Sequence, residues 1–395
     1  MKRRALLSLL VSSLVCAPLL GGCSPQGEAS SGSSAPPPSA QAGEGFVLTQ
    51  PSPRTRTLRD PQTSLKGVTN LKAVGMLTGE QSVNKTKTNY NIAGCDLGIF
   101  IQHKDKVYIA FGDTFSGDDS GNHMVGGWRS NTLAYTSDLD ASDGIRFDGM
   151  ISNAKVGDKK AIEILPSQKA DRIEMTVIPT GGFSLGGAMY LAFMSVRHWG
   201  EPGSWEVNYG GLAKSADDGQ TWQKLDSLKW EDPSFGQLCP LVVGDTVYFY
   251  AIPGGRNGGL KIMRVQADRV EQRDQYEYLT GFGADGAPVF GKGDPAKTAE
   301  VVPPAVGEPC VVFNRYLDEY LLVYFSGNQI GLRASKNPWG PWSAFLPFVS
   351  SEDYPQLYGG FMSPAYTSNG GKTVYFTMSL YGDYNVALMS LDLMK

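Results

Sequence analysis

The sequence predicts an all-β protein, a five-bladed β-propeller that is closed by a strand from the N-terminal part of the chain. Three features lead to this prediction: a short apolar motif that recurs five times, a strand-like segment before the first repeat, and a missing strand after the last repeat. Radial repetition of this kind leaves few free sheet edges when one end of the chain completes the blade begun by the other end.

The recurring motif is a β-branched or aromatic run that follows a tight turn and usually contains tyrosine. Its five copies are residues 107–111, 189–193, 247–250, 321–325 and 374–378. Each copy lies across a hairpin-type turn from an earlier apolar run and is followed by a third apolar segment. The third strands are expected to begin near Ser130, Gly210, Gly259, Ile330 and Asn385. Fourth strands are expected near Ile145, Trp222, Val270 and Trp342.

The fifth repeat has no fourth strand, because the chain ends at Lys395 soon after its third strand. Residues 71–77 precede the first repeat, have the pattern of a strand and would supply the missing one. A β-sandwich could use the same number of strands, but it needs neither a five-fold repeat nor a strand from the far terminus.

A loop in the second repeat supports the propeller independently. Residues 215–222 match the pattern S-x-D-x-G-x-T-W, the Asp-box of sialidase-type propellers, and residues 337–342 form a degenerate copy. We expect Ser215 and Asp217 to hydrogen-bond the loop backbone while Trp222 packs between blades, which is a structural role without chemistry.

The N-terminus has the pattern of a bacterial export signal. Three basic residues precede an apolar stretch, residues 5–20, that is too short to remain as a membrane-spanning helix. Residues 20–23, Leu-Gly-Gly-Cys, have the spacing of a lipobox, so we expect cleavage after residue 22 and lipidation of Cys23. An ordinary secretory signal with an incidental cysteine would lead to the same compartment. The expected location is the cell envelope, with a lipid anchor in the membrane.

The composition after the signal indicates a tether followed by one domain. Residues 23–66 are rich in Ser, Gly and Pro and are expected to form a disordered linker, and residues 67–395 form the propeller. Without residues 1–22 the chain has 32 basic and 39 acidic residues, a net charge of −7, which argues against a nucleic-acid partner. The three cysteines left after cleavage and lipidation, Cys95, Cys239 and Cys310, have no CxxC spacing, and the chain has only three histidines, which argues against a metal centre. We expect no cofactor, and we expect a monomer.

Two aspartates are the leading catalytic candidates. Asp96 opens the inner strand of the first repeat, and Asp113 closes the next strand at the same rim, where propeller sites lie. Neighbouring strands are about 5 Å apart, within the range of about 5–9 Å between carboxylates that glycosidases use to protonate the leaving oxygen and to attack or activate water. The alternative is that both residues are turn-capping aspartates.

Further candidates surround this pair. Glu308 opens the inner strand of the fourth repeat and should face the same cavity as a third catalytic carboxylate, unless it is simply a solvated residue before a proline. Near Asp113, Trp128 offers a stacking face or blade packing, Arg129 a cation for a carboxylate, and Asn131 an amide for sugar hydroxyls. The remaining substrate-binding candidates on that rim are His198, Trp199, Asn208, Tyr209, Asn328, Arg333 and Tyr358.

At residues 94–98, 111–115 and 128–131 the chain resembles domain-of-unknown-function family 4185, which includes the endo-D-arabinanases of glycoside hydrolase family 183. The similarity runs from about residue 67 to the C-terminus. It implies a five-bladed fold, cleavage of α-linked D-arabinofuranose chains in cell-wall arabinogalactan or lipoarabinomannan, and catalysis by paired aspartates, here Asp96 and Asp113. Cys95 departs from the small or hydroxyl residue expected beside the first aspartate.

Two classes of function follow from these features. The first is a membrane-anchored endo-acting arabinan hydrolase. The second is a non-catalytic propeller that binds the same glycan. A propeller glycosidase for another substrate, L-arabinan or sialic acid, is a third possibility, although the three-arginine clamp of a sialidase cannot be assigned among Arg129, Arg197, Arg256 and Arg333.

Overall fold

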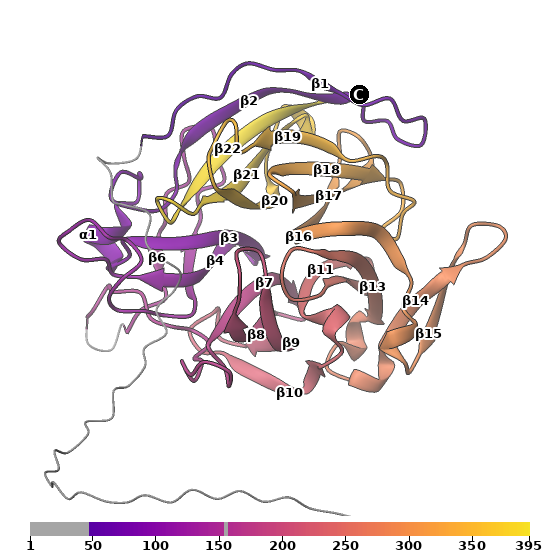
Figure 1. The fold of residues 1–395 in the computed structure, drawn as a ribbon, viewed down its shortest axis with the longest axis horizontal. Coiled ribbons are helices and arrows are strands. Elements are labelled where there is room, and N and C mark those ends of the chain that lie inside the picture. The colour runs from indigo at the N-terminus through magenta and orange to yellow at the C-terminus, as the bar shows by residue number, and fades with distance from the viewer. Residues whose placement is uncertain (1–46, 154–156) are drawn as a thin grey trace, which may run out of the picture. The chain divides into compact units, whose positions relative to one another are not determined.

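The computed structural model describes residues 47–153 and 157–395, and strands make up most of their regular structure (Figure 1). Four sheets with antiparallel pairing contain these strands. The first sheet comprises β3 (Gly94–His103), β4 (Lys106–Phe115), β5 (Thr132–Thr136) and β6 (Gly149–Met150). The second comprises β7 (Thr176–Leu185), β8 (Ala188–Trp199), β9 (Trp205–Ser215) and β10 (Gln223–Trp230).

The other two sheets are larger. The third has nine strands: β11 (Gln237–Val243), β12 (Thr246–Ile252), β13 (Gly258–Gln266), β14 (Glu277–Phe282), β15 (Pro288–Lys292), β16 (Glu300–Asn314), β17 (Glu319–Ser326), β18 (Gln329–Ser335) and β19 (Leu346–Ser350). The fourth comprises β1 (Arg56–Thr57), β2 (Gly67–Met76), β20 (Leu357–Ser368), β21 (Thr373–Leu380) and β22 (Asn385–Met394). Within the described ranges the α-helix α1 (Thr86–Tyr90) lies between β2 and β3, and the other helical segments are short 3-10 turns.

The recurring motif predicts the second strand of each unit correctly. Its five copies lie within β4, β8, β12, β17 and β21, and each of these strands pairs with the strand before it and the strand after it. Central strands that are covered on both faces favour continuous runs of β-branched and aromatic residues, which is why this motif is the strongest repeat signal in the sequence.

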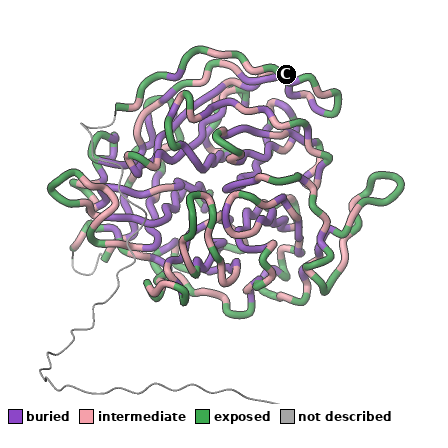
Figure 2. The backbone as a smooth tube through the Cα atoms, viewed as in Figure 1, coloured by how far each residue is buried: buried purple, intermediate pink, exposed green. Residues whose placement is uncertain are grey.

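The first strand of each unit lines a central hub. β3 contacts β7, β7 contacts β11, β11 contacts β16, β16 contacts β20, and β20 contacts β3, so these five strands form a closed ring around the middle of the view in Figure 1. Figure 2 shows that buried residues concentrate in the strands, whereas most exposed residues lie in connecting loops. The hub is therefore the place where the starts of five separate strands come together.

The third and fourth repeats form one continuous sheet, and the strand expected near Val270 begins only at Glu277, as β14, which pairs with β13 through Tyr278 opposite Met263. Val270 follows a 3-10 turn, Ala267–Arg269, in a polar segment that lacks the apolar alternation of a strand. The first part of β16 also pairs with β13, where Gly258 lies opposite Val306 and Leu260 opposite Val302.

The closing strand predicted from residues 71–77 lies in β2. β2 pairs antiparallel with β22 from the far end of the chain, with Gly67 opposite Met394 and Met76 opposite Ala387. The N-terminal part of the domain thus completes the C-terminal sheet, as the sequence predicts.

The tether was expected to extend to residue 66, and this boundary is wrong from residue 47 onwards. Leu58 and Leu65 are buried, and the buried carboxylate of Glu319 accepts hydrogen bonds from Thr63 Oγ1 at 2.5 Å and from the Ser64 backbone N–H at 2.8 Å. These partners lie more than 250 residues away in the sequence, so composition could not reveal them. The predicted signal, Cys23 and the first part of the tether lie outside the described residues.

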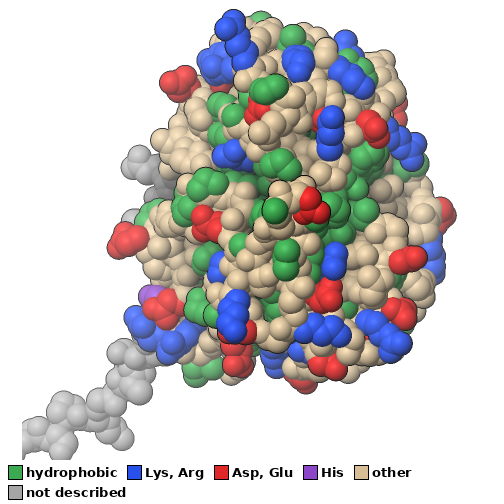
Figure 3. Space-filling view, turned by 90° about the vertical axis from the view of Figure 1, so that its right-hand side faces the viewer, with side chains coloured by type: hydrophobic (Ala, Val, Ile, Leu, Met, Phe, Trp, Pro, Cys, Tyr) green, Lys and Arg blue, Asp and Glu red, His purple; other side chains and the backbone are tan. Residues whose placement is uncertain are grey.

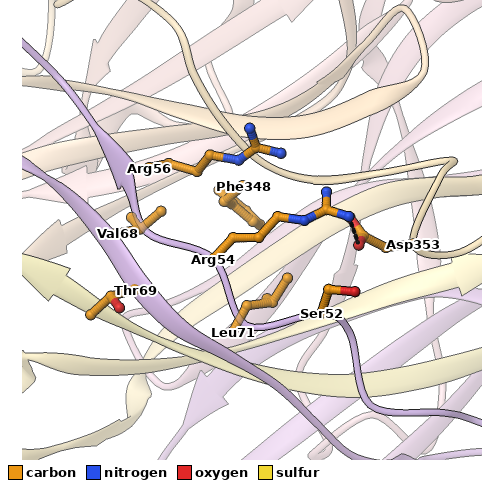
Figure 4. A pocket seen from close by; sticks show the side chains of 8 residues that line it. All are labelled: Ser52, Arg54, Arg56, Val68, Thr69, Leu71, Phe348 and Asp353. Carbon is orange, nitrogen blue, oxygen red and sulfur yellow. Dashed lines mark ion pairs between the residues drawn. The ribbon is translucent and has the colours of Figure 1, made fainter.

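The same N-terminal segment closes a small cavity beside β2 (Figure 4). Arg54 points across it and forms an ion pair with Asp353, with 3.2 Å between Nη2 and Oδ1. The volume of about 10 Å³ is at the lower limit for one water molecule, so this cavity is too small for a sugar ligand.

Two smaller expectations are also tested by the structure. In the Asp-box, Asp217 accepts hydrogen bonds from Thr221 and Ser215, and Trp222 Nε1 donates to the Gly219 carbonyl oxygen at 3.0 Å, which confirms its structural role. The described cysteines, Cys95, Cys239 and Cys310, are buried and free.

On the face shown in Figure 3, acidic and basic side chains are interspersed. No helix among the described residues is long and apolar enough to cross a membrane.

Candidate active site

Asp96 and Asp113 lie on two paired strands, Asp96 on β3 and Asp113 on β4, near enough for the charge of Asp113 to raise the pKa of Asp96. Cys95 pairs with Thr114 and Leu97 with Phe111, so Asp96 lies opposite the two residues between them, in a β-bulge. Leu97 has a φ of +72°, and bulges with such conformations re-aim side chains at functional sites. Gly112 makes room for the carboxylate, because a Cβ atom there would lie 2.4 Å from Asp96 Oδ1.

The Asp113 carboxylate is buried and held by two hydrogen bonds. Its Oδ1 atom accepts from Trp128 Nε1 at 2.8 Å and from Thr176 Oγ1, on β7, at 2.6 Å. Burial raises the pKa of Asp113 to about 6, although the two hydrogen bonds oppose this rise by stabilising the charged form. Asp113 is therefore ionised above about pH 6.

The Asp96 carboxylate has a higher pKa. Tyr358 Oη, on β20, donates to Asp96 Oδ2 at 2.8 Å, whereas the buried Oδ1 has no hydrogen-bond partner among the described residues. Burial and, second, repulsion by Asp113 raise the pKa of Asp96 to about 7. Asp113 loses its proton at the lower pH, and its negative charge then raises the pKa of Asp96. Between about pH 6 and 7, Asp113 is mostly charged while Asp96 keeps its proton.

Glu308 lies close to this pair but is engaged in an ion pair. It is 8% exposed, and its Oε1 atom accepts from Arg256 Nε at 2.7 Å and Nη2 at 2.6 Å. The Arg256 guanidinium lies over the ring of Tyr358, 4.8 Å from its centroid, and also contacts Trp205 and Phe325 at 5.4 Å. A continuous chain of contacts thus runs from Glu308 through Arg256 and Tyr358 to Asp96.

Trp128 contacts Asp113 directly and holds it in place. Its ring stacks with Phe115, with 6.4 Å between centroids, and Lys169 Nζ lies 4.7 Å from the ring centroid. The positive charge of Lys169 also lowers the Asp113 pKa and so opposes part of the effect of burial.

Arg129 and Asn131 have other roles than those expected. Arg129 donates to the carbonyl oxygens of Ala161 and Asn91 at 2.9 and 2.8 Å rather than to a carboxylate. Asn131 is fully buried, and its amide donates to the carbonyl oxygens of Leu165 and Val177. Both side chains donate hydrogen bonds to backbone carbonyl oxygens, so neither the Arg129 guanidinium nor the Asn131 amide is free for a ligand.

Four candidates lie together on the outer parts of β8 and β9. His198 Nδ1 lies 2.6 Å from Asp171 Oδ1, and Asn208 donates to the carbonyl oxygen of Ile173 at 2.7 Å. The rings of Trp199 and Tyr209 meet neighbouring aromatic rings, with centroids 5.5 Å from Trp205 and 6.0 Å from Phe193. Of these four, Trp199 is linked to Arg256 through the ring of Trp205.

Arg333 and Asn328 lie apart from the carboxylates. Arg333, on β18, donates to Tyr324 Oη and to the carbonyl oxygen of Ser343, so it packs against its own sheet, contrary to the expectation that it lines the rim. Asn328 is exposed in the turn between β17 and β18. Tyr358, in contrast, was expected to contact substrate and instead contacts Asp96 directly.

Sequence reasoning missed the two residues that link the carboxylates to other strands, Arg256 and Thr176. Arg256 follows Pro-Gly-Gly in the turn between the second and third strands of its unit, which is the rim position at which the sequence search was aimed. The glycine-rich turn was therefore a usable signal for Arg256. Thr176 starts an inner strand, as Asp96 does, but carries no charge that would distinguish it.

A cavity of about 310 Å³ occupies the hub further along the same five inner strands. The residues lining it include Ile99 and Gln102 on β3 and Phe361 on β20. These lie three to six residues beyond Asp96 and Tyr358, or about 10–20 Å along a strand. Asp96, Asp113 and Glu308 do not line this cavity, so the carboxylates and the cavity are distinct places. Within the described ranges, no group of three or more acidic, His or Cys side chains is arranged to hold a metal ion.

Comparison with known proteins gives one family match and several structural ones. A protein of Aspergillus sp. (strain MF297-2), notoamide biosynthesis cluster protein J, is 28% identical over 330 residues, which cover 77% of this chain and 83% of that protein. A solved structure from Bacteroides ovatus ATCC 8483, described as a candidate hydrolase, has a TM-score of 0.58 at 14% identity and covers 85% of this chain and 93% of its own. A GH43_1 enzyme from Xanthomonas citri has a TM-score of 0.47 at 12% identity, covering 82% and 91%. The model of DUF4185, a domain of unknown function, matches residues 81–390, and the chain therefore belongs to that family.

Proposed function

We propose that the protein is a glycoside hydrolase that cleaves arabinofuranosyl linkages in cell-wall arabinan, as an endo-D-arabinanase. The observation that carries the proposal is the pair of aspartates on adjacent paired strands whose pKa values are both raised, to about 7 for Asp96 and to about 6 for Asp113. Two carboxyl groups whose environments separate their pKa values take the acid and base roles in glycosidases.

In this mechanism Asp96 is the general acid. Its proton passes to the glycosidic oxygen as the bond from that oxygen to the anomeric carbon breaks. Asp113, ionised and oriented by Trp128 and Thr176, either attacks the anomeric carbon or takes a proton from the attacking water. Tyr358 stabilises the carboxylate that Asp96 becomes after it has given up its proton.

The proposed architecture is a five-bladed propeller. The ring of five inner strands supports it, and so does the strand that the N-terminal part of the chain adds to β22. In this interpretation the nine-stranded sheet is two blades, joined where β16 leaves β13 and continues as the inner strand of the next unit.

Charges around the site favour a neutral glycan over sialic acid. Arg129 and Arg333 donate to backbone carbonyls, Arg256 is paired with Glu308, and Arg197 is exposed and donates to a backbone carbonyl of a neighbouring loop. None of these four arginines is free to bind a substrate carboxylate. The lipid anchor at Cys23, which we propose on the lipobox alone, would hold the enzyme in the cell envelope beside such a polymer.

Release of reducing ends from purified arabinogalactan tests the proposal. The full-length protein should release them, and Asp96→Asn and Asp113→Asn should lower the rate by at least about 100-fold while circular dichroism shows the same fold. Arabinan binding without any release by the unmodified protein would instead identify a glycan-binding propeller. L-arabinan and a sialoside in the same panel show whether another glycan is the substrate.

A further inference from the structure

Two buried carboxylate oxygens of the candidate site have no hydrogen-bond partner among the described residues. They are Asp96 Oδ1 and Glu308 Oε2. Buried polar atoms are nearly always hydrogen-bonded, so each exception calls for an explanation. In the proposed mechanism Asp96 Oδ1 is available to carry the proton that is transferred. Glu308 Oε2 has no such role, and it lies in a residue that is 8% exposed.

The surroundings of Glu308 argue against its being the catalytic acid. Both donors of the Arg256 fork bind the other oxygen, Oε1, and the aromatic rings around Arg256 hold the guanidinium in place. Gly307 lets the Arg256 side chain lie against β16, because a Cβ atom at position 307 would be 2.9 Å from Arg256 Cγ. A carboxylate that is fixed by a permanent cation is suited to accept hydrogen bonds, not to deliver a proton.

The backbone also directs Glu308 toward the site. Glu308 has a φ of +42°, in the left-handed region that residues with a side chain rarely adopt, and it lies in a second bulge, between the pairs Gly307–Phe325 and Cys310–Val323. Asp96, on β3, lies in the same kind of interruption. Strained conformations of this sort persist where the surroundings fix them, and they cluster at ligand sites.

We propose that Glu308 is a specificity residue whose Oε2 atom accepts a hydrogen bond from a hydroxyl group of the sugar ring bound at Asp96. The substrate class is then a neutral sugar with a free hydroxyl at that position. Deoxy sugars leave the charged oxygen buried and unpaired, and acidic sugars meet the charges of Asp113 and Glu308. This inference rests on the proposed hydrolase function and refines it.

The experiment compares two enzymes on two kinds of substrate. The substrates are a fluorogenic arabinofuranosyl oligosaccharide and matched compounds that each lack one ring hydroxyl. The unmodified enzyme should lose about 10- to 100-fold in kcat/KM on one deoxy compound, because a hydrogen bond to a charged group is lost. Glu308→Gln should lose a similar factor on the complete substrate and lose little more on that deoxy compound.

Glu277→Gln is the matched control, because Glu277 accepts a hydrogen bond from Arg264 Nε at 2.9 Å and Arg264 also lies over an aromatic ring, away from the hub. It should leave the discrimination unchanged. Binding of both compounds to Asp96→Asn, measured by calorimetry, gives a readout that does not need turnover. If Glu308→Gln does not fold, Glu308→Asp keeps the charge and withdraws the carboxylate by one methylene.

The outcomes separate the two proposals. If Asp96→Asn keeps full activity, the hydrolase mechanism is wrong. If Asp96→Asn is inactive but Glu308→Gln lowers the rate equally on the complete substrate and on every deoxy compound, the mechanism stands and the role of Glu308 is refuted. Equal affinity of Asp96→Asn for the complete and deoxy compounds would refute it as well.

Discussion

The two limbs of the pH–activity profile should respond to different substitutions. Activity needs Asp113 ionised and Asp96 protonated, so the profile should be bell-shaped, with limbs near pH 6 and pH 7. Tyr358→Phe removes a hydrogen bond to the charged form of Asp96. Such a bond is worth about 1.5 kcal/mol at the low end, or about one pKa unit, so the alkaline limb should move to about pH 8.

The size of the effect follows from these two limbs. At pH 8 about one tenth of the unmodified enzyme is in the working protonation state, and in Tyr358→Phe this share rises to about one half. Trp128→Phe removes a hydrogen bond from the charged form of Asp113, so it should move the acid limb upward by a similar amount and leave the alkaline limb in place.

The assay is kcat/KM on an arabinan oligosaccharide from pH 4 to 9, with enzyme stability checked at each pH. Tyr324→Phe is the matched control, since Tyr324 accepts a hydrogen bond from Arg333 away from the carboxylates, and neither limb should move. If Tyr358→Phe and Trp128→Phe shift the same limb, or if neither shifts a limb, the assignment of acid and base is refuted.

Three further predictions concern stability and packing. Because burial raises the Asp96 pKa from 3.8 to about 7, the folded protein holds that proton more tightly than the unfolded chain, and stability falls as pH rises between about 4 and 7. Asp96→Asn should therefore be more stable at pH 8 by up to about 4 kcal/mol and no different at pH 3, measured by denaturant titration. Gly112→Ala should reduce kcat at least about 10-fold, because its Cβ would displace the Asp96 carboxylate, whereas Gly75→Ala, with open space around it, should not; equal activities would contradict the packing. Thr63→Ala should destabilise the domain by about 1–3 kcal/mol by leaving the buried Glu319 carboxylate short of a donor, and an unchanged melting temperature would show that the N-terminal segment does not matter.

Local patterns predicted the elements that depend on local chemistry. The five apolar runs are second strands, because a strand covered on both faces needs the same residue types in every unit. The pairing of β2 with β22 followed from counting strands per repeat. The placement of Asp96 and Asp113 on the two paired strands of one hairpin also followed from the sequence, since a hairpin fixes the register between its strands.

The misassignments share a physical cause, which is a partner far away in the sequence. Residues 47–66 were assigned to the tether because their composition is poor in apolar residues, but Glu319 orders part of them. Asn131 was expected to bind a sugar, but its amide N–H donates a hydrogen bond to the carbonyl oxygen of Val177 on β7.

The sequence by itself determined the all-β class, the strands that recur, and the placement of Asp96 and Asp113 on adjacent strands, because each depends on residue type and spacing within a single unit. It also determined the closure by an N-terminal strand, because the last unit lacks a strand and an extra one precedes the first unit. Only the tertiary structure decided which of the two aspartates has the higher pKa, that Arg256 holds Glu308, and that Tyr358 joins this pair to Asp96. These features depend on burial and on contacts among side chains from different units, and such contacts exist only once the inner strands have closed the ring.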